Sequence, residues 1–323
     1  MRGRYIAAIV LGLALGGATS FGLLWWFDVA AESLVRRLEP RPVTTILGMH
    51  RMDPQIGYEL LPGAVLRHTT REFDVEYHID GDGGRRVPGG DSGGPRVDVY
   101  GDSWTFGHGV ADDETFAAVL QRRRPAWWVR NRGVMGYGTV HAMLSLERDL
   151  ARDGPPDAIV YAFNPIHVIR NHLRDTHVKH VAGGRTPAYD VVKGRLHSRG
   201  LLGAEHAIPS GTPGLARAEI TRTRLYLRRM AALARNAGVR FVVVLLDGPQ
   251  RISGWNDSNE RVAGLCRRNE IEFHDLTRRS NEAPDSEAYF DDDHPTASWH
   301  ATTGAEIDGI FAAESRPRGP RFP

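Results

Sequence analysis

The stretch Arg96-Val-Asp-Val-Tyr-Gly-Asp-Ser-Trp-Thr-Phe-Gly107 decides the fold. Its first half alternates β-branched residues and ends in a glycine, which is typical of a buried strand that runs into a tight turn. Ser103 stands just past this strand, and in an open α/β sheet the chemistry collects at the carboxyl ends of strands. A lone hydroxyl is a weak nucleophile, so it needs a base, a group that orients the base and donors for an oxyanion.

Strand and helix patterns alternate from residue 97 onward. Short β-branched runs predict strands, and longer periodic runs predict helices. This alternation indicates a parallel sheet covered on both faces, so we expect an α/β fold. Asp112 or Asp113 is expected to cap the first helix. The expected strands are 96–100, 127–131, 157–163, 239–246 and 271–274, and the expected helices are 114–123, 139–150, 216–237, 260–269 and 296–313.

The composition is that of an ordinary globular protein, with 41% hydrophobic and 25% charged residues in a chain of 323. The formal net charge is only +2, which argues against a nucleic-acid partner, because such proteins carry a dense basic surface. Cys266 is the single cysteine, so no disulfide can form within the chain. It lies in an apolar helical pattern, and we expect a buried, unreactive thiol.

The N-terminus carries a long apolar run. Residues Tyr5 to Phe27 contain no charged side chain and are long enough to cross a bilayer as a helix. Trp25 and Trp26 stand where an interfacial aromatic belt would lie. We expect an uncleaved transmembrane anchor with the catalytic domain on the extracytoplasmic side. The alternative is a signal peptide cleaved near residues 18–20, but the apolar run continues past that point.

Five segments make up the expected domain organisation. A β-rich lead-in precedes the alternating pattern, and a long polar insertion interrupts it. The segments are a transmembrane anchor at 1–27, a juxtamembrane linker at 28–52, a catalytic domain at 53–314 with an insertion at 166–214, and a disordered tail at 315–323.

Two turns follow the second and third expected strands. The first, between Asn131 and Thr139, is rich in glycine, which lets a backbone amide approach a ligand closely. The second carries Asn164 before Pro165. A side-chain amide at this place could donate to an oxyanion, although an asparagine before a proline is often only a turn former.

A late acidic motif supplies a possible base. Asp291, Asp292 and Asp293 directly precede His294, just before the last expected helix. A carboxylate shortly before a histidine can hold the ring and fix its tautomer. An acidic loop can also do no more than cap a helix. The motif therefore indicates a catalytic base only in combination with the turns that carry Ser103, the glycines and Asn164.

Together these motifs resemble the SGNH (GDSL-type) hydrolase family over about residues 55 to 314. The resemblance implies a flavodoxin-like, three-layer α/β/α fold and a Ser-His-Asp triad of Ser103, His294 and Asp291. It implies an oxyanion hole made by the backbone amides of Ser103 and Gly136 and by the side chain of Asn164. The stretch from Ile56 to Pro62 is also similar to one found in membrane-anchored relatives.

The chain departs from the family pattern at the third motif, where Pro165 replaces the usual aspartate and removes a backbone N–H. The choice of carboxylate is also open on chemistry alone. Family spacing selects Asp291, but Asp292 could equally reach His294. Asp102 is expected to stabilise its turn rather than to react.

We therefore expect a serine esterase that acts through an acyl-serine intermediate on an acylated small molecule or a glycan of the cell envelope or a secreted polysaccharide. The alternatives are an O-acyltransferase with the same triad and a catalytically silent carbohydrate-binding protein. No cofactor and no metal are expected, and the sequence does not define the oligomeric state. The insertion histidines could instead hold a metal, but a substrate-facing wall is the favoured interpretation; they are His167, His172, His177 and His180.

Overall fold

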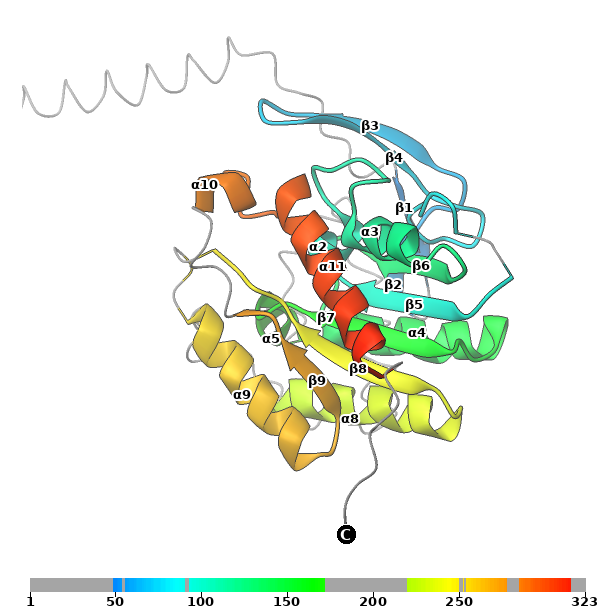
Figure 1. Ribbon diagram of the computed structural model, residues 1–323, viewed down its shortest axis with the longest axis vertical. Helices are drawn as coiled ribbons and strands as arrows, with labels where there is room; N and C mark the ends of the chain where they lie inside the picture. Colours follow the sequence, from blue (N-terminus) through cyan, green and yellow to red (C-terminus); the bar gives the residue numbers. More distant parts are fainter. Residues whose placement is uncertain are drawn as a thin grey trace, which may run out of the picture. The chain divides into compact units, whose positions relative to one another are not determined.

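Parallel strands form the central sheet of the computed structural model (Figure 1). The structure describes residues 49–53, 56–90, 93–171, 220–249, 252, 254–277 and 285–314. Within them the sheet has the order β6-β5-β7-β8-β9, and each neighbouring pair is parallel. The strands are β5 (Arg96–Gly101), β6 (Trp128–Gly133), β7 (Ala158–Phe163), β8 (Arg240–Leu245) and β9 (Glu272–Asp275). All five lie within a few residues of the expected strands.

Side chains of β7 and β8 alternate between two apolar cores, as a sheet buried on both faces requires. Tyr161 and Val243 belong to the core shared with α4 (Thr139–Asp153), α8 (Thr221–Asn236) and α9 (Trp255–Arg268). Val160 and Val242 belong to the opposite core, under α3 (Phe116–Arg123) and α11 (Ala297–Glu314). Figure 1 shows α3 and α11 side by side over their face of the sheet. The expected three-layer α/β/α architecture is thus present.

The strand order places a switch point at β5. The chain passes from β5 to β6 on one side and then returns to β7 on the other side. In such sheets, ligands bind at the carboxyl ends of the strands that flank the reversal. The turns after β5, β6 and β7 carry Ser103, Gly136 and Asn164, so the topology brings these three residues to one edge of the sheet.

The β-rich lead-in consists of two antiparallel pairs. These are β1 (His50–Asp53) with β2 (Gly57–Leu60), and β3 (Val65–Thr69) with β4 (Asp74–His78). The hydroxyl of Tyr58 on β2 donates to the carbonyl of Met135 over 2.9 Å, and the hydroxyl of Tyr137 donates to the carbonyl of Tyr58 over 2.6 Å. The lead-in therefore supports the glycine-rich turn after β6.

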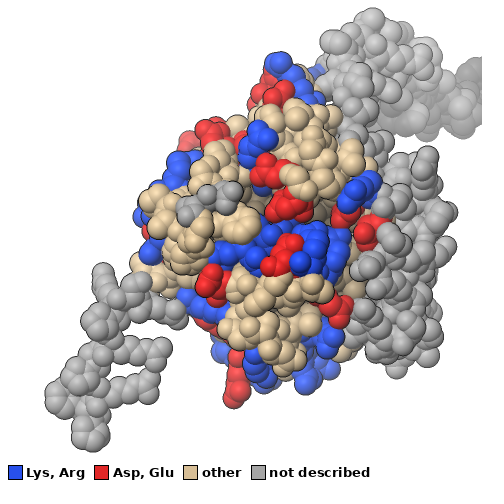
Figure 2. Space-filling model, turned by 90° about the vertical axis from the view of Figure 1, so that its right-hand side faces the viewer, with Lys and Arg blue, Asp and Glu red and all other residues tan. Residues whose placement is uncertain are grey.

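Charged side chains on β5 and β6 are paired with one another. Arg130 makes a bidentate contact with Asp98, at 2.6 and 2.5 Å, and a further one with Asp153 at 2.7 Å. Arg132 reaches both Asp82 and Asp153. Figure 2 shows Lys and Arg side chains interspersed with Asp and Glu on one face of the molecule. The contacts of Arg130 and Arg132 with aspartates explain how β6 accommodates two buried arginines, because a buried charge needs a partner.

The helix boundaries differ from the expected ones in three respects. Thr115, and neither Asp112 nor Asp113, caps α3, since its side chain accepts the N–H of Ala118. Asp112 instead pairs with the fully buried Arg85. α9 begins at Trp255, before the expected start. Three short helices were not expected, because four or five residues are too few to show a helical period. They are α2 (Ser103–Phe106), α5 (Ile166–Arg170) and α10 (Asp285–Ala288).

The expected anchor at Tyr5–Phe27 lies outside the described residues, as do most of the insertion and the tail at 315–323. Along the described ranges, no helix has both the length and the apolar character needed to cross a bilayer.

Candidate active site

A sharp turn after β5 presents the serine. Asp102 caps the first turn of α2, and its side chain accepts the N–H of Trp104 over 3.0 Å. Gly101 precedes this turn in a position where a Cβ would lie 2.0 Å from Thr105 Oγ1. Only glycine fits there, which explains the Gly-Asp-Ser sequence. As expected, Asp102 stabilises the turn.

His294 lies against the serine. Its Nε2 is 2.9 Å from Ser103 Oγ, and its Nδ1 is 3.1 Å from Oδ2 of Asp292. The backbone N–H of His294 also donates to Oδ1 of Asp292, over 3.2 Å. Burial alone would raise the pKa of Asp292, but close contacts with His108 and His294 outweigh it and hold that pKa well below the usual carboxylate value. An ionised carboxylate, an imidazole and a hydroxyl thus follow one another in line.

The carboxylate at His294 is Asp292, whereas family spacing had selected Asp291. The turn that carries these residues is the physical reason. The N–H of Asp293 donates to the carbonyl of Phe290, and Asp293 adopts a left-handed conformation with φ 67°. This folds the side chain of Asp292 back onto the residue two positions later. Asp291 instead donates its backbone N–H to the side chain of Glu72.

Three donors line the same edge of the sheet. Among the described residues, the N–H groups of Ser103 and Gly136 and the Nδ2 of Asn164 have no hydrogen-bond partner. Gly136 has φ 82°, which favours glycine. Oδ1 of Asn164 accepts the N–H of Ile166 over 3.0 Å, so the amide nitrogen is the atom left to donate. Asn164 therefore forms the turn and keeps a donor available, despite Pro165.

A buried polar network lies under the turn that carries Ser103. Asp102 is fully buried, and its Oδ2 accepts from Arg170 Nη1 over 2.6 Å and lies 3.3 Å from His167 Nε2. Burial opposes its ionisation, but His167 and Arg170 hold the pKa of Asp102 below its usual value. Burial lowers the pKa of His167, whose Nδ1 lies 2.7 Å from the hydroxyl of Tyr161. His167 thus belongs to this network rather than to a substrate-facing wall.

His108 is a site residue that the sequence analysis missed. Its ring is 6% exposed and lies 4.2 Å, centroid to centroid, from the ring of His294. Its Nε2 is 3.4 Å from Oδ2 of Asp292, so one carboxylate oxygen serves two histidines. The available signal was its place between Gly107 and Gly109, directly after the serine motif. Together, His108, Asp292 and His294 are the described residues that could hold a metal ion.

Aromatic rings surround this pair of histidines. Phe73, in the turn between β3 and β4, lies 5.4 Å from the ring of His108 and 5.2 Å from that of Phe290. His68 on β3 lies 5.1 Å from His108. The lead-in thus forms one side of the site, and its rings cover the buried His108, whereas the side chain of Asp292 is 47% exposed.

A further candidate residue, Cys266, does not join the site. Cys266 is buried, and burial raises the pKa of its thiol to about 12, so it is not a nucleophile at neutral pH, as expected. Of the insertion histidines, only His167 is described; the others lie outside the described residues.

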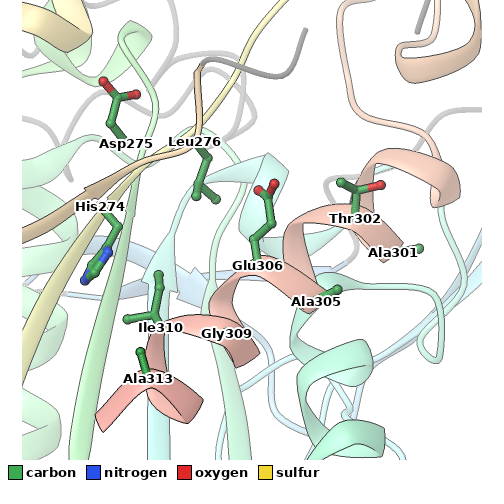
Figure 3. Close-up of a pocket in the computed structure, with 10 residues that line it drawn as sticks. All are labelled: His274, Asp275, Leu276, Ala301, Thr302, Ala305, Glu306, Gly309, Ile310 and Ala313. Carbon is green, nitrogen blue, oxygen red and sulfur yellow. The ribbon is translucent and has the colours of Figure 1, made fainter. Parts of the chain in front are cut away.

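A separate hollow of about 830 Å³ lies between β9 and α11 (Figure 3). In Figure 3, Glu306, Gly309 and Ile310 of α11 face His274 and Leu276 across it. None of the residues placed in the candidate active site lines it. The hollow therefore plays no part in the chemistry considered below.

No protein-family model matches the chain, and no curated protein sequence matches it. Solved structures do match. The fold is similar to that of GDSL-type lipolytic proteins. The psychrotrophic esterase EstA from Pseudoalteromonas sp. is 10% identical, with 69% of this chain and 100% of that chain covered and a TM-score of 0.44.

Two further solved structures match the chain with similarly low identity and high coverage. A member of the lipolytic protein G-D-S-L family from Veillonella parvula DSM 2008 is 14% identical, with 67% and 98% covered and a TM-score of 0.44. The lipase/acylhydrolase from Enterococcus faecalis is 12% identical, with 68% and 96% covered and a TM-score of 0.46. At such identities and scores the likeness carries no inference about chemistry, which has to rest on the geometry of the site.

Proposed function

We propose that this chain is a serine hydrolase of the SGNH type that cleaves carboxylic esters. The observation that carries the proposal is the contact of 2.9 Å between Ser103 Oγ and His294 Nε2, with Asp292 on the far side of the ring. A serine, a base and an orienting carboxylate in this order form the constellation that activates a hydroxyl for acyl transfer. Asp292 takes the place that family spacing assigned to Asp291.

The proposed reaction begins when Ser103 Oγ attacks the ester carbonyl and His294 Nε2 accepts its proton. Asp292 holds the proton on Nδ1 and stabilises the imidazolium. The oxyanion binds the N–H groups of Ser103 and Gly136 and the Nδ2 of Asn164. His294 then donates its proton to the leaving alkoxide oxygen, which frees the alcohol and leaves an acyl-serine. A water that gives its proton to His294 then attacks the acyl carbonyl. The bond to Ser103 Oγ breaks, the acid leaves, and His294 returns the proton to Ser103 Oγ.

The test is covalent labelling followed by a substrate screen. A fluorophosphonate should add once to the protein, as measured by intact-protein mass spectrometry, and Ser103→Ala should abolish the adduct. The parent, but not the variant, should hydrolyse p-nitrophenyl acyl esters. Labelling that persists in Ser103→Ala would remove this serine as the nucleophile. A silent binding protein would neither be labelled nor turn over an ester.

The substrate and the location form a further part of the proposal. We propose that residues 5–27 anchor the chain in a membrane with the domain outside, and that an acylated envelope or secreted glycan is the substrate. The uncharged run at 5–27 supports the first point. Fractionation should leave full-length protein in the membrane, accessible to added protease. Acetylated glycans with and without a sugar acceptor would separate hydrolysis from acyl transfer, which the same triad supports.

A further inference from the structure

We propose that His108, Asp292 and His294 form a binding site for a transition-metal ion of the Zn²⁺ type, and that the bound ion switches the active site off. The binding site is argued from the side chains alone. The inhibitory effect rests on the function proposed above, so the two are tested separately.

The spacing of the ligand atoms fits such an ion. Asp292 Oδ2 lies 3.4 Å from His108 Nε2 and 3.1 Å from His294 Nδ1, and the three ligand atoms lie within 4.8 Å of one another. Zn²⁺ binds imidazole nitrogen and carboxylate oxygen at about 2.0–2.2 Å in a tetrahedral arrangement. Two such ligands are then about 3.4 Å apart. Both measured separations are therefore close to what a single ion requires.

The donor set narrows the class of ion. Two imidazoles and one carboxylate suit zinc and its neighbours in the first transition series, whereas Mg²⁺ and Ca²⁺ prefer oxygen ligands alone. Three protein ligands leave a fourth position for water. The ligands come from two segments, the turn after α2 and the turn before α11, so an ion would join them.

The surroundings favour occupation. His108 is 6% exposed and packs against Phe73. Nδ1 of His294 is buried and makes no well-aligned hydrogen bond, although Asp292 Oδ2 is close enough for an ion pair. A metal ion between these two atoms would coordinate both the ring nitrogen and the carboxylate oxygen. The side chain of Asp292 is 47% exposed, so an ion can reach the site from solvent.

Occupation would disable the proposed base. A metal ion on Nδ1 of His294 leaves the ring proton on Nε2, the atom that faces Ser103. Nε2 then has no lone pair with which to accept the serine proton. The ion would also withdraw Asp292 from its orienting role. Asp292 and His294 would thus serve either the triad or, together with His108, the metal.

The binding experiment uses full-length Ser103→Ala protein, which keeps all three ligands and needs no activity. After metal is stripped with a chelator, isothermal titration with Zn²⁺ should give one tight site. Co²⁺ should give the intense visible absorption of a tetrahedral ion. His108→Gln should weaken Zn²⁺ affinity at least about tenfold, the scale on which disturbed ligation acts. The matched control is Asp291→Asn, next to the site, which should bind as the parent does.

The activity experiment measures ester hydrolysis by the parent and by His108→Gln, each relative to its own rate in chelator. Zn²⁺ should inhibit the parent reversibly, and His108→Gln should need at least about tenfold more ion. Affinity that is the same in Ser103→Ala and Ser103→Ala/His108→Gln would place the ion elsewhere on the chain and overturn the proposal. Tight binding through His108 in a protein without esterase activity would preserve the metal site and refute only the proposed function.

Discussion

Nη1 of Arg170 donates to Oδ2 of the fully buried Asp102 over 2.6 Å. The same nitrogen donates to the carbonyl of Tyr137 over 3.0 Å. Asp102 precedes the proposed nucleophile Ser103, and Tyr137 follows Gly136, whose N–H is a proposed oxyanion donor. One guanidinium therefore ties the serine turn to the turn that carries the oxyanion donor.

Arg170→Met should lower kcat about 10²-fold with little change in KM, because a misplacement of about 1 Å between reacting groups costs this much. It should also lower the free energy of unfolding by roughly 3 kcal/mol, since a buried carboxylate loses a partner. Arg170→Lys should recover part of both losses. Steady-state kinetics and thermal unfolding measure them. Arg229→Met is the matched control, because Arg229 pairs with Glu147 at the surface; it should change neither.

Asp292→Asn and Asp291→Asn form a pair that separates geometry from motif spacing. Asp292→Asn should reduce kcat about 10⁴-fold, because it removes the charge that holds the correct tautomer of His294. Asp291→Asn should stay within about threefold of the parent, since no contact with His294 is lost. If Asp291→Asn proved the more damaging change, the carboxylate at His294 in the structure would not be the working one.

The strands and most helices could be predicted because their residues repeat with the period of the structure. Val160 and Tyr161, which are neighbours in sequence, belong to opposite cores. A continuous apolar strand such as β7 is stable when both of its faces are buried, as in the middle of a parallel sheet. The places of Ser103 and Asn164 followed from the same patterns, since a polar residue directly after a buried strand stands at the sheet edge. Gly101 and Gly136 indicated the turns that follow the first two strands of the sheet.

The partners of these residues could not be predicted, because they depend on local turns and long-range contacts. Whether Asp291 or Asp292 reaches His294 depends on the left-handed conformation of Asp293, which no periodicity reveals. His108 meets Asp292 only through tertiary packing. Arg170 looked like part of a polar insertion, but the short helix α5 aims it at Asp102.

Stability should fall in mild acid because several histidines are buried without charge. Burial lowers the pKa of His68 to about 4 and that of His300 to about 3. The unfolded chain binds protons at these rings near pH 6.5, whereas the folded chain does not. Their full contribution is therefore present above pH 6.5. Below pH 6.5, each histidine lowers the free energy of unfolding by about 1.4 kcal/mol per pH unit, until the pH reaches its pKa in the folded state.

Denaturant unfolding of the parent and of His300→Gln between pH 6.5 and 4.5 tests this slope. The side chain of glutamine can still accept the N–H of Phe116, which now donates to Nδ1 of His300. The slope of the variant should be lower by about 1.4 kcal/mol per pH unit. The control is His274→Gln, at a side chain that is 39% exposed, and it should keep the slope of the parent. Equal slopes for His300→Gln and the parent would show that His300 does not govern the acid response.

Substitutions of Asn164 test whether this residue both stabilises the turn and donates a hydrogen bond to the oxyanion. Its Oδ1 accepts the N–H of Ile166, while Nδ2 is left to donate. Asn164→Ala removes both groups, whereas Asn164→Asp keeps the acceptor, removes the donor and adds a negative charge. Each should lower kcat about 10²- to 10³-fold with KM nearly unchanged, because the donor acts in the transition state. Both variants should lose thermal stability, the alanine variant through the lost turn hydrogen bond and the aspartate variant through a buried charge. A loss of activity below about threefold in a folded Asn164→Asp would make Asn164 a turn residue alone. The oxyanion would then depend on the N–H groups of Ser103 and Gly136.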